Sequence, residues 1–527
     1  MLTSDQIIEK IKNPVSGDEL QAGIDLQNVH KVHITGEGWE AKLNQLVGFE
    51  SESDWDVRKQ LTGPGTMKLA ALILDNLNRW VTNQGTVKII RFKQQEEQEP
   101  KFKEVLDQVW RGKPLEDFIR TFYKEAIYQE MNGFLLVTKP QINEIEGTQI
   151  REGIATPYDG KSALMPYLIF IAAEDVKDFY GVGDELEYLI FKIGEDEDSN
   201  PIYRVIDKDQ DLIVSEENEK LTILIEKVNE VGYVPAIQVT NIAKKLVDDL
   251  TKTSPIDHVI PALNRYMQKD SDLIMQMVRH MYPKLAIVTT ACKQCDGQGW
   301  NFDIDPKVRC TDCNGSGKTI PLSRDGVLGI PQYLDPDLSP YPGSPASYIT
   351  PDNDSLRTAI DDLKDLYKEI LYSATGDKNL IVEGLDTATE NLINFKGLED
   401  RIAEIVEMVE SREEFIVIAV GDMHRDFSNA IEGVSVRYGR RMAIRGENEI
   451  MKEITAAKQA GMPISHIEAL QRELIYARYK NNKVELERHL LLADLEPLNG
   501  YTVEEFSEMV GFVSAEDMKI KFNFNRI

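Results

Sequence analysis

Long apolar runs and widely spaced cysteines are both absent from this 527-residue chain. Its longest apolar runs, around Leu69–Leu74 and Phe415–Val420, fall far short of the roughly 20 residues that span a bilayer. The first fifteen residues carry Glu9 and Lys10 inside their apolar pattern, which excludes a secretory signal. All four cysteines lie within 22 positions, so no disulfide framework extends through the chain. We therefore expect a protein of a reducing cytosol with no membrane segment.

Positive charge is also scarce, since 60 Lys and Arg face 89 Asp and Glu for a formal net charge of -29. This balance argues against a broad basic face that grips phosphate by counterion release. An acidic surface suits a channel wall past which DNA slides, because repulsion between like charges keeps the DNA from adhering. Solubility alone explains the charge equally well. Hydrophobic residues at 42% and charged residues at 28% indicate a packed soluble protein of roughly three or four structural units.

Recognisable catalytic patterns are missing as well. The seven histidines are scattered, and none lies in a nucleophile elbow. The adjacent carboxylates Asp361–Asp362 and Glu413–Glu414 fall on expected helices, where a solvated face is the usual explanation. Gly315–Thr319 is similar to a phosphate-binding loop, but Asp312 stands where that motif needs its first glycine. We expect a protein that is not an enzyme.

The periodicity changes in the middle of the chain. Residues 1–253 mix helical and strand patterns, with polar loops expected at Gln94–Lys101 and Gly194–Pro201. A long one-faced helix begins at Ser254–Pro255, where serine can cap and proline fits the first turn. Two more long helices follow, and the last part is mostly helical. The fold class is therefore α+β. The expected division is 1–253, 254–283 (helix), 284–350 (insert without a helix), 351–376 (helix), 377–390 (polar loop), 391–442 (long helix and a strand) and 443–527 (helical).

The strongest local signal is two Cys-x-x-Cys pairs, Cys292/Cys295 and Cys310/Cys313. Four thiolates on tight turns close a tetrahedral site, for which structural zinc is the usual occupant and leaves no open coordination position. An iron–sulfur site and unligated thiols are the alternatives. Each pair continues with glycines that fold the backbone towards sulfur. These CxxCxGxG units resemble the zinc repeats of J-domain co-chaperones, but there are two units instead of four and His-Pro-Asp is absent.

The order of the segments over roughly residues 40–510 resembles the portal family of tailed bacteriophages. Its most specific stretches, besides the first long helix, are Ser347-Tyr348-Ile349-Thr350-Pro351, Thr387-Ala388-Thr389-Glu390 and Val434–Arg441. The resemblance implies an α/β wing (1–253), stem helices (254–283 and 351–376), a clip (284–350), a tunnel loop (377–390), a long helix that returns to the wing (391–442) and a helical crown (443–527).

By that resemblance, twelve copies form a ring at one capsid vertex of the virion, through which double-stranded DNA is packaged and ejected. The ring assembles in the host cytoplasm with the major capsid protein and scaffold, docks the large terminase subunit and later binds the head–tail adaptor. The apolar stripes of the long helices are compatible with such a ring, and equally with packing inside one chain.

The resemblance bears on the polar loop and on the cysteine cluster. In the tunnel loop, Lys378 and Asn379 could touch DNA phosphate, while Glu383 and Asp386 keep that contact weak; a solvated surface loop is the alternative. The cysteine cluster departs from the family, and we infer that zinc replaces a core in a clip too thin to bury enough apolar surface. The alternative function is a zinc-stabilised binding module or co-chaperone; a zinc hydrolase would need ligands that the four cysteines do not offer.

Overall fold

The computed structural model describes most of residues 2–496, together with residues 519 and 521. The positions outside the description are 1, 49, 83–86, 94, 140–147, 151–164, 183–184, 197, 218–219, 245–249, 281–283, 290–291, 302–307, 314, 316, 318–326, 332–345, 350–352, 378–387, 429, 439–446, 463, 480–482, 497–518, 520 and 522–527.

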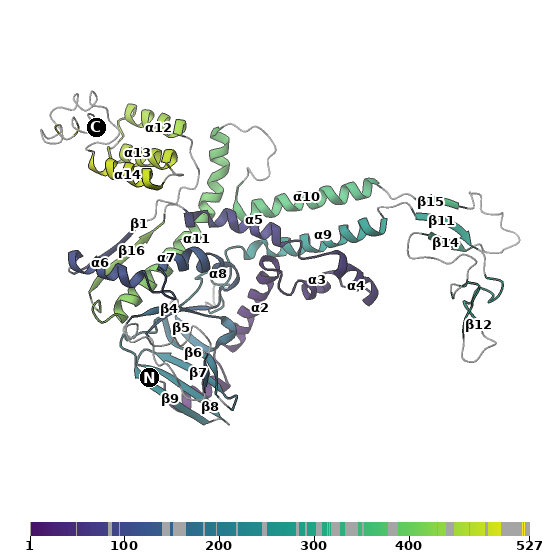
Figure 1. Cartoon of the computed structure of the whole chain (residues 1–527), viewed down its shortest axis with the longest axis horizontal. Helices are drawn as coiled ribbons and strands as arrows, with labels where there is room; N and C mark the ends of the chain where they lie inside the picture. Colours follow the sequence, from purple (N-terminus) through teal and green to yellow (C-terminus); the bar gives the residue numbers. More distant parts are fainter. Residues whose placement is uncertain are drawn as a thin grey trace.

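Helices and mostly antiparallel sheets share the chain, which confirms the α+β fold (Figure 1). A body of sheets and helices carries a long two-helix arm on one side. The helices of the body are α1 (Ser4–Lys12), α2 (Gly17–Ile34), α3 (Trp39–Val47), α4 (Glu52–Leu61), α5 (Met67–Leu77), α6 (Gln95–Leu106), α7 (Leu115–Phe118), α8 (Lys124–Gln129) and α11 (Ala388–Met423).

The largest sheet has the strand order β3-β6-β7-β8-β9, and β5 also pairs with β6. Successive side chains of a strand point to opposite faces, and both faces of β7 are covered. Ile202 and Ile206 face the core shared with the smaller sheet, whereas Tyr203 and Val205 face α1. The strands are β3 (Thr148–Ile150), β5 (Val176–Val182), β6 (Glu185–Asp196), β7 (Pro201–Asp207), β8 (Gln210–Glu217) and β9 (Lys220–Val228).

A three-stranded sheet, β10-β2-β4, separates two cores. Every residue of β2 (Phe134–Thr138) is buried. Phe134 and Leu136 face the core of the large sheet, while Leu135 and Val137 face the main core formed with α5, α7, α8 and α11. This strand therefore joins the sheet half of the body to its helical half. The other strands of the sheet are β4 (Tyr167–Ile171) and β10 (Ala236–Gln238).

Two expected loops are wrong. Residues 94–101 were expected to form a polar loop, but α6 occupies Gln95–Leu106 in spite of Pro100. The reason is that Phe102 and Val105 bury one side of this helix, with Phe102 in edge contact with the ring of Phe92. The second expected loop begins too early, because β6 continues through Gly194 to Asp196.

The first long helix begins later than expected. Residues 257–259 form a 3-10 turn, and α9 follows at Ile260–His280. The Ser254 hydroxyl accepts a hydrogen bond from the backbone N–H of Ile256 at 3.4 Å, so it closes a local turn before the helix. Pro261, instead of Pro255, occupies the first turn of the helix, where proline costs no hydrogen bond.

The other long helices lie close to their expected places. They are α10 (Asn353–Thr375) and α11, whose residues Leu398, Ile402 and Val406 are buried at helical spacing in the main core. After α11, strand β16 (Ile431–Arg437) pairs antiparallel with β1 (Val87–Phe92). None of the described helices is long and apolar enough to cross a membrane.

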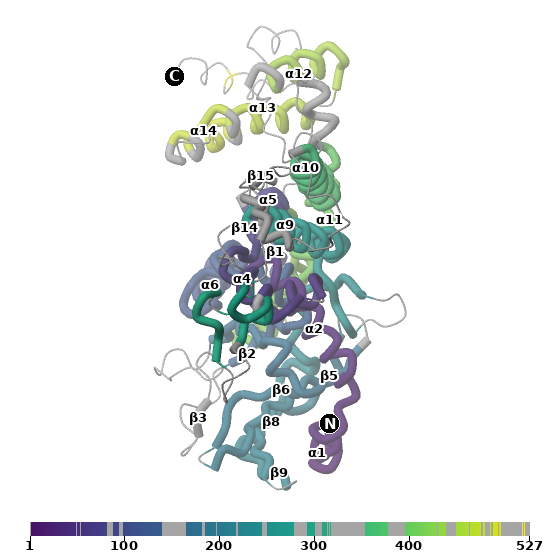
Figure 2. Tube along the Cα trace, turned by 90° about the vertical axis from the view of Figure 1, so that its right-hand side faces the viewer, coloured from purple at the N-terminus to yellow at the C-terminus, as the bar shows by residue number. Residues whose placement is uncertain are grey.

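The C-terminal helices have a small core of their own. Ile450, Ile454, Ala457, Ile467 and Leu470 form a separate buried cluster. Figure 2 shows these helices at the opposite end of the body from β9 and α1. Most of the last expected segment, beyond residue 496, lies outside the described residues. The helices are α12 (Glu447–Gln459), α13 (Ile464–Tyr479) and α14 (Lys483–Leu495).

Candidate metal centre at the end of a helical arm

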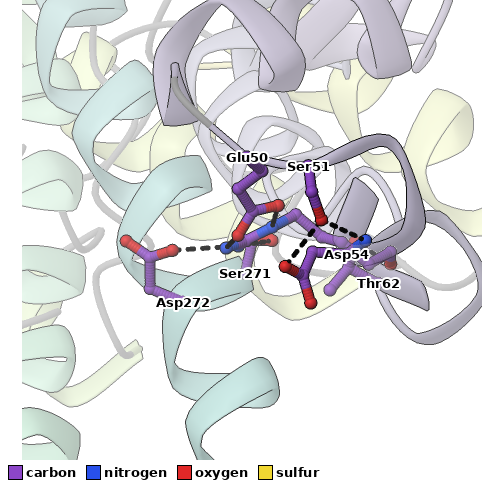
Figure 3. A network of polar contacts seen from close by, with 7 residues as sticks. Glu50, Ser51, Asp54, Thr62, Ser271 and Asp272 are labelled. Atoms are coloured by element: carbon purple, nitrogen blue, oxygen red, sulfur yellow. Dashed lines mark hydrogen bonds and ion pairs between the residues drawn. The ribbon is translucent and has the colours of Figure 1, made fainter. Parts of the chain in front are cut away.

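The root of the arm is fixed by a buried arginine. Arg58 of α4 is 4% exposed, and its guanidinium donates to both carboxylate oxygens of Glu50, at 2.5 and 2.9 Å. It also donates to the Ser271 hydroxyl at 2.8 Å and to the Asp272 carboxylate at 2.9 Å, both on α9 (Figure 3). These hydrogen bonds, above all those to Glu50, raise the pKa of Arg58. A bidentate, charge-assisted contact of this kind has a defined geometry, so α4 holds α9 at a set position.

Helices α9 and α10 then run side by side away from the body (Figure 1). The rings of Tyr266 and Tyr367 lie 6.3 Å apart, and Lys269 pairs with Asp362. The chain stays paired beyond the helices, because β11 (Lys284–Thr289) is antiparallel to β15 (Ala346–Ile349) and parallel to β14 (Val327–Pro331). The arm therefore ends in a small sheet, and the cysteine cluster lies between β11 and β14 in the chain.

The four predicted cysteines meet at the end of the arm. Their side chains are buried, and the four sulfur atoms all lie within 4.8 Å of one another. The Sγ atoms of Cys292 and Cys310 are 3.9 Å apart, and those of Cys295 and Cys313 are 3.6 Å apart. A disulfide would need about 2.05 Å. Four sulfurs at about 2.3 Å from one zinc ion, in a tetrahedron, lie about 3.8 Å from each other, so the cluster has the size of a single-ion site.

Glycines shape the two Cys-x-x-Cys turns, as the sequence predicts. The backbone N–H of Gly299 donates to the Cys295 sulfur, and that of Gly317 donates to the Cys313 sulfur, each at 3.2 Å. Both glycines have positive φ, +79° and +71°. A Cβ on Gly299 would lie 2.5 Å from the Gly315 oxygen, and one on Gly317 would lie 2.2 Å from the Gly297 oxygen. The two turns therefore pack backbone against backbone and leave no space for a side chain.

Two of the thiols differ in acidity. Burial raises the pKa of Cys295 to about 11. Burial acts in the same direction on Cys313, but hydrogen bonds from the Gly317 and Gly315 amides and from the neighbouring thiols lower its pKa to about 6. These amide hydrogen bonds favour the thiolate of Cys313, and the thiolate is the form of cysteine that binds a metal ion.

This arrangement can bind one metal ion in a closed tetrahedral site. Separations below 4.8 Å leave no space for a multinuclear iron cluster between the sulfurs, whereas a single ion that prefers thiolates fits. With four protein ligands no position remains for water or substrate. Among its described residues, the segment around the cluster has no apolar core beyond the four cysteines. Binding of a metal ion would therefore supply the stability that folds this segment.

An exposed face with one aromatic ring, not predicted from the sequence, lies beside the cluster. Residues Trp300–Asn301 (β12) and Val308–Arg309 (β13) form a short antiparallel pair, with Trp300 opposite Arg309. Trp300 is 41% exposed and Val308 is 46% exposed. The Arg309 guanidinium lies 5.9 Å from the centre of the Trp300 ring. A lone tryptophan after a Cys-x-x-Cys-x-Gly-x-Gly unit gave no pattern from which its exposure could be predicted.

The predicted DNA-contact residues, Lys378 and Asn379, lie outside the described residues. The base of that segment is described. Gly376 ends α10 with φ +71°, and a Cβ on Gly397 would lie 2.4 Å from the Gly376 oxygen. The chain therefore returns in α11 to the point where it left α10, and both positions require glycine.

No family model and no curated protein matches the sequence. One solved structure, described as the "Neck of empty GTA particle computed with C6 symmetry", is similar to 79% of this chain and 86% of that chain, with 10% sequence identity and a TM-score of 0.32. A similarity this weak carries no weight for the fold or the function.

Proposed function

We propose that the chain is the portal subunit of a tailed bacteriophage, a structural protein that is not an enzyme. The observation that carries this proposal is the arm: two long paired helices leave an α+β body and hold a small sheet and the cysteine cluster at their far end (Figure 1). The third long helix and the separate C-terminal helices follow in the order that the sequence resemblance implies. In this function the body is the wing, α9 and α10 are the stem, the insert is the clip, and the C-terminal helices are the crown.

The proposed ring has twelve subunits and lies at one vertex of the capsid. The arms surround the channel through which double-stranded DNA enters and leaves. The net charge of -29 supports this role, because an acidic wall does not retain DNA. The partners are the capsid protein and scaffold during assembly, the large terminase subunit during packaging and the head–tail adaptor afterwards.

The ion in the cysteine cluster is proposed to be structural zinc. Its support is the size of the cluster, together with four sulfur ligands and no open position. Zinc has no redox chemistry, so its contribution is rigidity at the end of the arm. It substitutes for the apolar core that so small a segment cannot build.

The test is the mass and shape of the purified full chain. A ring of twelve 59.8-kDa chains has a mass of roughly 720 kDa and shows a central hole in negative-stain electron microscopy. Native mass spectrometry gives the number of chains and the zinc per chain in the same spectrum. A chain that stays monomeric at all concentrations, and binds unfolded polypeptides through the cysteine cluster, would favour the zinc-stabilised binding module instead.

A further inference from the structure

The body of the chain contains a cavity whose lining is both aromatic and acidic. The cavity has a volume of about 370 Å³ and lies between the C-terminal end of α2, helix α8 with the turn before it, and strand β4. Helices α2 and α8 pack against each other there (Figure 1). Small-molecule sites have volumes of roughly 300–1,000 Å³, so this cavity has space for a small ligand.

Two phenylalanines give the cavity an apolar surface. The rings of Phe122 and Phe170 both line it, with their centres 5.0 Å apart. Both residues are half-buried, so part of each remains accessible from the cavity. The face of an aromatic ring attracts a cation, and the same ring packs against an alkyl chain.

The cavity already holds one ammonium group of the chain itself. Lys31 belongs to the lining, and its Nζ atom lies 2.8 Å from the Glu130 carboxylate and 3.3 Å from that of Glu174. Burial raises the pKa of Glu130 above its ordinary value, and the negative charges of Glu174 and Glu37 act in the same direction. The carboxylates of this region therefore act on one another, and Lys31 neutralises only part of their charge.

Two further carboxylates of the lining have no such partner. Within the described part of the chain, Glu37 pairs with no cation, and Glu125 pairs only with its neighbour Lys124, at 4.0 Å. Three carboxylates against one ammonium group leave the lining with a net charge of -2. Thr35, which also lines the cavity, caps the C-terminal end of α2, where the helix dipole favours a positive charge.

We propose that this cavity binds a small organic cation, an alkyl chain that carries two ammonium groups. Its alkyl part packs against Phe122 and Phe170, and its ammonium groups pair with Glu37 and Glu125, which Lys31 does not neutralise. A single metal ion fits less well, because the four cysteines are the one group of three or more ligands that converges on a point among the described residues. The proposal does not rest on the portal function.

The experiment is calorimetric titration of the full chain with 1,4-diaminobutane at low ionic strength. We expect saturable binding of one diamine per chain. The control ligand is 1,4-butanediol, which has the same alkyl chain without the charges and should not bind. An amine with one charge, n-butylamine, should bind more weakly than the diamine, because it pairs with only one carboxylate.

Variants of the chain locate the binding site. Glu37→Gln combined with Glu125→Gln should weaken diamine binding roughly tenfold, or about threefold for each exposed ion pair that is lost. Phe122→Leu should weaken it roughly threefold, because the cation–π contact is lost. Glu217→Gln combined with Glu226→Gln is the matched control: it removes the same charge from exposed positions of β8 and β9 and should change the affinity less than twofold. Both double variants replace exposed side chains, so both should fold as the native chain does.

The pattern of losses decides the inference. Weaker binding in the cavity variants, with the control variant unchanged, supports it. Absence of binding, several diamines per chain, or equal losses in the two double variants would overturn it, because general attraction to an acidic protein would then explain the heat. The peptide acetyl-Gly-Lys-Gly-amide offers the same ammonium group as a protein side chain. If it bound the cavity more tightly than the diamine did, a lysine of a partner protein would replace the free amine as the occupant.

Discussion

The backbone contact between the two Cys-x-x-Cys turns predicts the effect of Gly317→Ala. An alanine at φ +71° costs about 1–2 kcal/mol of conformational strain. Its Cβ would also lie 2.2 Å from the Gly297 oxygen, so the first turn must shift, at a cost of roughly 1–3 kcal/mol more. Because metal binding and folding of this segment are coupled, we expect the zinc affinity to fall by about 3 kcal/mol, or roughly a hundredfold.

The assay is competition for zinc between the full chain and a chelator of known affinity at neutral pH. Gly112→Ala is the matched control, because Gly112 has a similar φ of +72° with nothing within 4 Å of its Cβ position. We expect this variant to lose about 1 kcal/mol of folding stability and to keep its zinc affinity. If Gly317→Ala bound zinc as tightly as the native chain, the packing of the two turns would not control the site, and the reasoning would be refuted.

Three further predictions concern the body. Burial lowers the pKa of His33 from 6.5 to about 4, so the unfolded chain takes up a proton first as the pH falls. The free energy of unfolding should therefore decrease by up to roughly 3 kcal/mol between these two pH values, as measured by denaturant titration. Arg58→Met removes the buried guanidinium and its hydrogen bonds to Glu50, Ser271 and Asp272, and should cost about 3 kcal/mol in the same assay. Tyr438→Phe removes a 2.5 Å hydrogen bond to the fully buried Glu413 and should cost about 1–3 kcal/mol.

Each of these predictions has a control in the same chain. His33→Gln should reduce the pH dependence of the free energy of unfolding between pH 6.5 and 4. An unchanged dependence would show that other groups cause it. Arg120→Met removes an arginine whose side chain is 60% exposed and pairs with Glu116. It should lower the free energy of unfolding by less than about 1 kcal/mol. Tyr372 is 40% exposed, so Tyr372→Phe should have almost no effect. If the buried and the exposed variant of a pair, such as Arg58→Met and Arg120→Met, lost the same free energy of unfolding, burial would not explain the effect. The same holds for Tyr438→Phe and Tyr372→Phe.

The features predicted from sequence are those that depend on local pattern. The cysteine pairs and their glycines sufficed to predict the two turns, because the spacing of ligands on one turn is a property of a few residues. The long helices were predicted for a similar reason, since apolar residues recur at three- and four-residue spacing over many turns. The α+β class followed from the same periodicities.

The features that were missed depend on contacts between distant residues. Helix α6 is stabilised by the packing of Phe102 against Phe92, which a polar stretch around Pro100 does not indicate. The Arg58 contact joins residues more than 200 positions apart in sequence, on α4 and α9. The exposure of Trp300 follows from a tip folded around sulfur instead of around a core. Only the folded chain brings these residues together.

The most direct test of the portal function is a cryo-electron microscopy reconstruction of the assembled full chain. The account predicts a closed ring in which α9 and α10 of every subunit surround one central channel, the cysteine clusters lie together at one end and the C-terminal helices lie at the other. A ring whose helical arms point outward, or an assembly without a central channel, would contradict it.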